Sequence, residues 1–189
     1  MVVLLSVVTN SGATMAPQMQ PPPDVVTFLP LDAPPFVRRA LAALRPDVIL
    51  LECTELWPTL MRAAHARGIK LALSNGRMSE KSAQSYARLF PWCGNPVPLL
   101  DALCLQTEAD LAWYRLFGAD DVKCAVTGNC KFDAAARRPP PEKVESLRAV
   151  LGNHAQWIAA GSTHVGEEDI ILDAFVHVHA RHPGTALLW

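Results

Sequence analysis

Short runs of aliphatic and β-branched residues recur along this chain, and longer segments with helical periodicity separate them. The runs cover residues 2–8, 25–29, 48–51, 70–74, 102–105, 122–126, 156–159 and 186–188. An alternation of this kind is typical of a parallel sheet whose strands are joined by helices. We therefore expect an α/β fold built on a Rossmann-like parallel sheet.

The segments between the predicted strands carry helix boundary signals. Pro58 suits the first position of a helix, and Gly68 suits its end. Ser79 suits an N-cap, and Thr107 begins a capping-box-like Thr-Glu-Ala-Asp sequence. These signals predict helices as the connections between strands.

Composition excludes several classes of protein. The chain has 189 residues, of which 50% are hydrophobic, enough for a sizeable core and too many for a disordered chain. Its 17 Lys and Arg against 18 Asp and Glu give a net charge of −1, which argues against a nucleic-acid partner. No apolar run approaches the roughly 18 residues of a membrane span. Residues 1–9 lack the features of a signal peptide and are interpreted as part of a buried strand.

The cysteines indicate neither a metal site nor a disulfide framework. There are five of them, and they form no Cys-x-x-Cys pair and match no zinc spacing. An odd number without a framework favours a reducing compartment. We expect no metal and no cofactor.

Three consecutive prolines, Pro139 to Pro141, follow an Ala-Ala-Ala-Arg-Arg sequence and predict a stiff, extended linker. We therefore expect a first domain over residues 1–138, a linker over 139–141, and the beginning of a second Rossmann-like domain over 142–189. The second segment holds only two predicted strands and two predicted helices, so it is expected to be marginal by itself.

Polar side chains follow three of the predicted strands, at the point where each strand ends. The candidates are Glu52 and Glu55 after strand 48–51, Asn75, Arg77 and Ser79 after strand 70–74, and Asn129 and Lys131 after strand 122–126. Ligands of open α/β sheets bind at the carboxyl ends of the strands. The sequence therefore predicts a site where these three clusters converge.

Each cluster also has a purely structural interpretation. Glu52 and Glu55 could favour the positive end of the following helix, and Ser79 could serve only as a cap. Lys131 could belong to a surface ion pair. Alternatively, two carboxylates at a sheet edge can transfer protons or bind hydroxyls, and a guanidinium such as that of Arg77 suits a phosphate or carboxylate.

A small-residue loop, Ala-Gly-Ser-Thr-His-Val-Gly-Glu-Glu, covers residues 160–168 after a predicted strand. Its candidates for ligand binding are Ser162, Thr163, His164 and Glu167. Backbone N–H groups in such a loop can cradle an anion. The loop could equally be a well-capped strand-to-helix turn, because it contains neither a dinucleotide fingerprint nor a P-loop ending.

Five stretches carry a family resemblance. They are Leu-Pro-Leu-Asp-Ala-Pro at 29–34, Glu-Cys-Thr-Glu-Leu-Trp-Pro at 52–58, Asn-Gly-Arg-Met-Ser-Glu-Lys-Ser at 75–82 together with Tyr86, Gly-Asn-Cys-Lys-Phe-Asp at 128–133, and the loop 160–168. In this order they resemble the 3-deoxy-D-manno-oct-2-ulosonic acid (Kdo) transferases of lipopolysaccharide synthesis. The strings at 52–58 and 75–79 are quite specific in combination.

The resemblance implies a GT-B glycosyltransferase with two Rossmann-like domains and an inverting, metal-independent reaction. CMP-Kdo would be the donor and a lipid A precursor the acceptor, with peripheral contact at the cytoplasmic face of the bacterial inner membrane. Glu55, with Glu52 second, would orient a hydroxyl or handle its proton. Arg77 and Lys131, with Asn75, Ser79 and Asn129, would bind substrate, and the four loop candidates would face the donor.

Two departures from the family pattern shape the expectation. The family carries a Ser-x-Gly-Glu motif in an N-terminal stretch, whose Glu is the expected base, and a later Pro-Arg-His segment; this chain contains neither motif. We therefore interpret it as a member truncated at both ends, inactive alone and soluble in the cytoplasm. The alternatives are another GT-B-like nucleotide-sugar enzyme, such as an epimerase, or a non-catalytic binding fragment.

Overall fold

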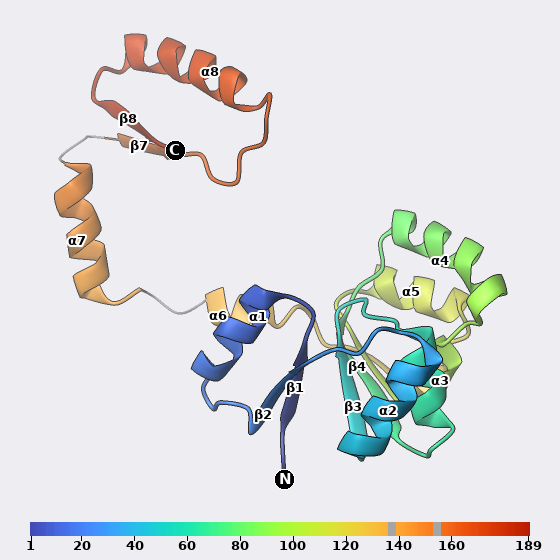
Figure 1. Cartoon of the computed structure of the whole chain (residues 1–189). Coiled ribbons are helices and arrows are strands. Elements are labelled where there is room, and N and C mark those ends of the chain that lie inside the picture. Colours follow the sequence, from blue (N-terminus) through green and yellow to red (C-terminus); the bar gives the residue numbers. More distant parts are fainter. Residues whose placement is uncertain (136–138, 153–155) are drawn as a thin grey trace. The chain divides into compact units, whose positions relative to one another are not determined.

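The structure is a computed structural model that describes residues 1–135, 139–152 and 156–189 (Figure 1). Two compact units, residues 1–132 and 133–189, make up the chain. The elements of the first are β1 (Leu4–Val7), α1 (Asn10–Met15), η1 (Ala16–Gln18), β2 (Val25–Phe28), α2 (Pro34–Leu44), β3 (Val48–Glu52), α3 (Pro58–His65), β4 (Lys70–Gly76), α4 (Glu80–Cys93), η2 (Val97–Leu99), β5 (Ala102–Leu105), α5 (Glu108–Leu116), η3 (Asp121–Lys123) and β6 (Cys124–Val126). Helix α6 (Lys131–Ala135) begins where this unit ends.

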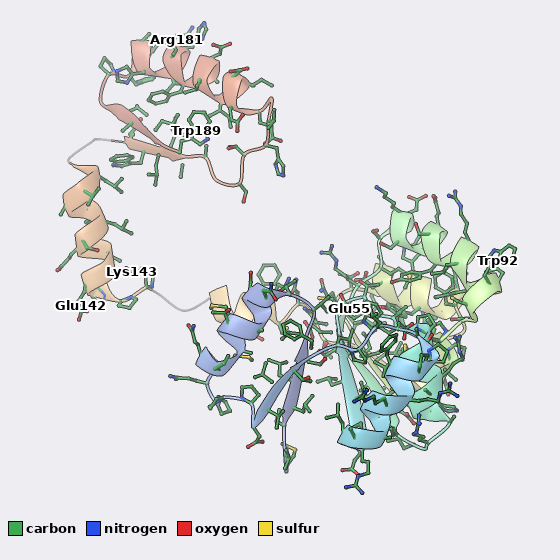
Figure 2. The ribbon with its side chains drawn as sticks, viewed as in Figure 1. Glu55, Trp92, Glu142, Lys143, Arg181 and Trp189 are labelled. Carbon is green, nitrogen blue, oxygen red and sulfur yellow. The ribbon has the colours of Figure 1, made fainter. Side chains whose placement is uncertain are left out.

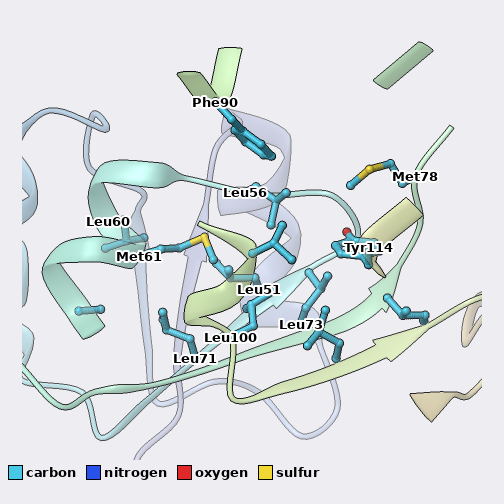
Figure 3. Close-up of a cluster of buried hydrophobic side chains, with 14 of the residues drawn as sticks. Leu51, Leu56, Leu60, Met61, Leu71, Leu73, Met78, Phe90, Leu100 and Tyr114 are labelled. Atoms are coloured by element: carbon cyan, nitrogen blue, oxygen red, sulfur yellow. The ribbon is translucent and has the colours of Figure 1, made fainter. Parts of the chain in front are cut away.

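A four-stranded parallel sheet in the order β3-β4-β5-β6 forms the centre of the first unit. Because side chains alternate along a strand, Leu51, Leu71, Leu73, Leu103 and Leu105 point to one face, where all five are buried. Helices α2 to α5 pack on this face with the buried apolar side chains shown in Figure 3. The α/β class and the parallel sheet predicted from the sequence are confirmed.

The opposite face of this sheet is open. Val48 and Leu50, which alternate with Leu51 along β3, are 58% and 66% exposed. Ala102 and Ala125 on the same face are also exposed. Parallel sheets are normally covered on both faces, so this sheet has one packed layer where the usual fold has two.

Strands β1 and β2 pair in parallel with each other but form a sheet of their own. The sequence predicted both strands as members of one Rossmann-like sheet with the rest of residues 1–138. The structure differs on this point. Among the described residues, no strand is hydrogen-bonded to both β1 and β3, so the two sheets are not joined.

Caps explain where the helices of the first unit begin. Pro58 is the first residue of α3, as predicted, and the backbone N–H groups of Thr59 and Leu60 donate to the carboxylate of Asp32 at 3.0 and 2.7 Å. Ser79 caps α4 and Thr107 caps α5, as their positions predicted. Asp32 therefore ties the segment after β2 to the start of α3.

The second unit contains α7 (Pro141–Leu151), β7 (Gln156–Ala159), α8 (Glu168–Arg181) and β8 (Thr185–Leu188). Strands β7 and β8 pair in parallel. Pro141, placed in the predicted linker, is the first residue of α7. Residues 136–138, the last of the predicted first domain, lie outside the described residues.

Candidate functional site

Glu52 and Asn75 stand at the carboxyl ends of two neighbouring strands and contact each other. Glu52 is the last residue of β3 and is in register with Ser74 of β4. Its carboxylate accepts a hydrogen bond from the Ser74 hydroxyl and another, at 3.0 Å, from the side-chain amide of Asn75. The structure thus brings together two of the predicted site residues, and the carboxylate of Glu52 holds the amide of Asn75 in one orientation.

Asn75 is buried, with 4% of its surface exposed, in an irregular part of the sheet. The register between β4 and β5 shifts between Leu73 and Gly76, and Asn75 has a positive φ of 51°. Its backbone carbonyl accepts from the Gln106 side chain at 3.0 Å, but its side-chain oxygen has no partner among the described residues. Bulges and left-handed residues that are not glycine cluster at functional sites, so this irregularity supports the predicted edge as the site.

The pKa of Cys53 is influenced by several charged side chains at this edge of the sheet. Cys53 also has a positive φ, 56°, and its thiol lies 3.7 Å from the Glu52 carboxylate. Partial burial and then the negative charge of Glu52 raise the pKa of Cys53, whereas the positive charges of Lys131 and Arg77 oppose that rise. The charges of Glu52, Arg77 and Lys131 therefore all act on Cys53 at the carboxyl edge of the sheet.

Glu55 lies in the turn after β3, with an exposed side chain (Figure 2). Its carboxylate accepts from the Trp57 indole N–H at 2.9 Å. Burial and the charge of Glu55 raise the pKa of Tyr86, whose hydroxyl donates to the Thr54 carbonyl at 3.0 Å. The Thr54 hydroxyl in turn donates to the Arg77 carbonyl at 2.7 Å, which joins the turn after β3 to the loop after β4.

Two features of the edge were not predicted from the sequence. A hollow of about 370 Å³ is lined by Lys81, Ser82, Ser85 and Tyr86 on α4. The spacing of these residues places them on one helix face, a signal that could have revealed it. The other is Asp110, a buried residue of α5 whose carboxylate accepts from the Met78 backbone N–H at 2.6 Å.

Ser79 and Asn129 are engaged with neighbouring backbone. The Ser79 hydroxyl accepts from the Ser82 N–H at 3.2 Å, and the Asn129 side-chain oxygen accepts from the Lys131 N–H at 3.0 Å. The side chain of Lys131 itself is exposed. The contacts of Ser79 and Asn129 thus agree with the structural interpretation of these residues, and their part in substrate binding stays a prediction.

The predicted donor loop belongs to the second unit. Ser162 has a positive φ of 59°. The His164 backbone N–H donates to the Glu167 carboxylate at 2.9 Å, and its imidazole Nδ1 lies 3.6 Å from the same oxygen. The indole of Trp189 donates to the Thr163 hydroxyl at 3.0 Å. Of the four candidates, His164 and Glu167 therefore contact each other, and Thr163 contacts Trp189.

Over the described ranges, no group of three or more His, Cys, Asp or Glu residues is placed to hold a metal ion. Within the same ranges, no helix is both long enough and apolar enough to cross a membrane.

The part of the chain that contains this sheet edge matches known proteins. The family described as 3-deoxy-D-manno-octulosonic-acid transferase (kdotransferase) matches residues 1–134. The 3-deoxy-D-manno-octulosonic acid transferases of Haemophilus influenzae and Bordetella pertussis are 31% and 32% identical over 162 and 158 residues, which cover 85% and 84% of this chain. These matches cover 38% and 36% of the two relatives, so this chain spans well under half their length.

Solved structures share the fold. A UDP-N-acetylglucosamine 2-epimerase superposes with a TM-score of 0.63 at 13% identity, over 97% of this chain and 52% of that one. The Neisseria meningitidis UDP-GlcNAc 2-epimerase bound to UDP-GlcNAc gives 0.53 at 14% identity, over 99% and 65%. At such identities the likeness concerns the fold alone. The matched stretch and the sequence relatives together show that the chain belongs to the 3-deoxy-D-manno-octulosonic acid (Kdo) transferase family.

Proposed function

We propose that this chain forms the acceptor side, and the start of the donor side, of a glycosyltransferase that moves Kdo from CMP-Kdo to a lipid A precursor. The observation that carries the proposal is the cluster of Glu52, Asn75 and the charges of Arg77 and Lys131 at one sheet edge, inside the stretch that matches the family. The reaction is inverting and metal-independent, and it takes place at the cytoplasmic face of the inner membrane.

In the proposed reaction, an acceptor sugar hydroxyl attacks the anomeric carbon of Kdo while CMP leaves. The transition state resembles an oxocarbenium ion, so positioning and electrostatics supply most of the catalysis. Glu55, whose carboxylate is exposed and held by the Trp57 indole, orients the attacking hydroxyl. Arg77 and Lys131 bind the acceptor phosphate or the Kdo carboxylate, because both provide cationic donors at the same edge.

Glu52 acts differently from Glu55 in this proposal. Its carboxylate already accepts from Ser74 and Asn75, so it serves as a positioning residue for the amide of Asn75. In the second unit, Ser162, Thr163, His164 and Glu167 contribute to donor binding through the backbone N–H groups and hydroxyls of their loop.

Transfer of radiolabelled Kdo from CMP-Kdo to a lipid A precursor tests the proposal. The 189-residue chain is expected to give no turnover, because loss of a general base alone commonly costs about 10²–10⁴-fold in rate. A chain extended at both ends with the corresponding segments of the Haemophilus influenzae relative should transfer Kdo.

Variants of the extended chain then test the residues. Glu55→Gln and Arg77→Ala should each lose most of the turnover, whereas the matched controls Glu145→Gln and Arg39→Ala should keep it. Clear turnover by the unextended chain, or full activity of both site variants, would contradict the assignment. A ligand-induced shift with UDP-N-acetylglucosamine and none with CMP-Kdo would favour a different nucleotide-sugar enzyme.

A further inference from the structure

Three consecutive carbonyl groups hold the backbone where β4 ends and its loop begins. The carbonyl of Asn75 accepts from the Gln106 side-chain amide at 3.0 Å, and the carbonyl of Gly76 accepts from the Gln106 backbone N–H at 2.8 Å. The carbonyl of Arg77 accepts from the Thr54 hydroxyl at 2.7 Å. The loop backbone therefore contacts both the turn after β3 and the turn after β5, although both are distant from it in the sequence.

The peptide group between Arg77 and Met78 is held at both of its polar atoms. Its C=O is the carbonyl that accepts from Thr54, and its N–H donates to the Asp110 carboxylate at 2.6 Å. A peptide group is a rigid plane, so one hydrogen bond at each end fixes its orientation. The preceding peptide group is also held, at the Gly76 carbonyl. Both planes that flank the Cα of Arg77 are therefore fixed, and with them the direction in which its side chain leaves the backbone.

Asp110 belongs to the packed part of the first unit. It is buried, as is Met78, whose side chain lies in the apolar cluster of Figure 3. The second carboxylate oxygen of Asp110 accepts from the Thr107 hydroxyl at 2.5 Å, and Thr107 caps α5 by accepting from the Asp110 N–H at 3.1 Å. A buried carboxylate is destabilising unless hydrogen bonds satisfy it, and here both oxygens have a donor. Arg77 itself is exposed, so a buried frame presents an exposed guanidinium.

We infer that Asp110, together with Thr54, is a positioning residue that fixes the Arg77 guanidinium at the carboxyl edge of the sheet. Both act through the peptide group that follows Arg77 and need no contact with substrate. The inference rests on the proposed function in one respect, namely that the positioned guanidinium binds the acceptor phosphate or the Kdo carboxylate. A two-pronged guanidinium contact depends on angle as well as distance, and a misplacement of about 1 Å can lower a rate by about 100-fold.

The thiol of Cys53 allows the position of the guanidinium to be tested without any sugar substrate. The positive charge of Arg77 is one of the groups that lower the pKa of Cys53. In the 189-residue chain, this pKa is measured from the pH dependence of alkylation by iodoacetamide, which separates the thiolate fraction from access to the thiol. Arg77→Ala should lower the thiolate fraction at pH 8 by about twofold, the effect of one charge at a partly exposed site.

Asp110→Ala should lower the thiolate fraction by the same factor, because the released loop lets the guanidinium move away from the edge. Loss of the Asp110 charge would by itself raise the fraction, so the two effects have opposite signs. In the Arg77→Ala background, Asp110→Ala should cause no further fall. Asp110→Asn keeps an acceptor for the Met78 N–H and should not lower the fraction. The exposed Asp47 provides the matched control, and Asp47→Ala should leave the fraction unchanged.

Thr54→Val and Thr54→Ser form a second pair, which decides the question if Asp110→Ala does not fold. Thr54→Val removes the hydrogen bond to the Arg77 carbonyl and should lower the thiolate fraction, whereas Thr54→Ser keeps the hydroxyl and should preserve it.

The inference is overturned if Arg77→Ala does not change the thiolate fraction of Cys53. It is also overturned if folded Asp110→Ala, or Thr54→Val in its place, leaves the fraction unchanged or raises it, or lowers it equally when Arg77 is absent. Kdo transfer is a separate measurement. If the alkylation results are as expected but turnover of the extended chain does not depend on Arg77, the proposed function is wrong and the positioning of the guanidinium stands.

Discussion

At the scale of single residues, the pKa of the Cys53 thiol depends on the charged groups at the carboxyl edge of the sheet. The thiol lies beside the Glu52 carboxylate and within the fields of Lys131 and Arg77. Its backbone is left-handed, as is that of Asn75 at the end of the neighbouring strand. Two strained residues that are not glycine, side by side at one edge, are typical of a site whose geometry is held by its surroundings.

The reactivity of Cys53 should therefore change in opposite directions when the charges around it are removed. At pH 8, below the raised pKa of Cys53, only the thiolate fraction reacts. Glu52→Gln lowers the pKa and should speed alkylation by iodoacetamide, whereas Lys131→Ala raises it and should slow alkylation. Peptide mass spectrometry separates Cys53 from the other four cysteines. Equal alkylation rates in the two variants would mean that the charges of Glu52 and Lys131 do not both act on Cys53 at this edge.

The buried Tyr114 and the half-buried Tyr86 allow a matched comparison of hydroxyl groups. The Tyr114 hydroxyl is buried without a partner among the described residues, whereas the Tyr86 hydroxyl donates to the Thr54 carbonyl. Tyr114→Phe should leave the free energy of unfolding unchanged or raise it by up to about 1 kcal/mol, and Tyr86→Phe should lower it by about 1 kcal/mol. Urea denaturation of the two variants measures the difference. A greater loss in Tyr114→Phe would reveal a partner for that hydroxyl.

At the scale of elements, the start of helix α3 is capped by a carboxylate that is distant in the sequence. Asp32 is 27 residues before Thr59, yet its two oxygens accept from the N–H groups of Thr59 and Leu60. Pro58, one residue earlier, has no N–H to offer, so the first free donors of the helix are the two that Asp32 satisfies. This contact holds the segment after β2 against the packed face of the sheet.

Asp32→Ala should accordingly destabilise the first unit by about 1–2 kcal/mol, the range of a lost helix cap. Asp32→Asn keeps an acceptor oxygen and should lose less. Asp47→Ala is the matched control, since the Asp47 side chain is exposed and makes no hydrogen bond or ion pair among the described residues; it should change the free energy of unfolding by less than about 0.5 kcal/mol. Chemical denaturation monitored by tryptophan fluorescence gives all three values.

At the scale of the whole molecule, the two units differ in how much they bury. Unit 1–132 has a continuous apolar core beneath its four-stranded sheet. In the described part of unit 133–189, Thr185 is the only buried residue, and Ile170 of α8 is 70% exposed. A two-stranded sheet with two helices buries too little apolar surface to be stable alone.

Hydrogen exchange should therefore protect the second unit far less than the first. The amides of Trp157 and Ile158 in β7 are expected to exchange at least 100-fold faster than those of Leu71 and Leu73 in β4, because local opening of β7 breaks few contacts. Exchange monitored by NMR at neutral pH provides the comparison. Similar protection in both strands would show that something covers the second unit.

The sequence alone identified the segments that form strands β1 to β8 and the edge at which the candidate residues gather. Strands 102–105 and 156–159 match the structure residue for residue. Thr107 and Ser79 were identified as caps because a cap is encoded by residues within one turn of helix. Glu52, Arg77 and Lys131 were placed at one edge because parallel strands bring their carboxyl ends together.

Tertiary structure alone decided what those residues contact. The bond from Asn75 to Glu52, the capping of α3 by Asp32 and the bond from Met78 to Asp110 join residues 23 to 32 positions apart. The separation of β1 and β2 from the main sheet also has no local signal, since both strands have the same pattern as the others. Local patterns determine whether a segment is a strand or a helix, because neighbouring residues set them. Pairing and long-range contacts depend on which edges and faces meet, and only the folded chain determines that.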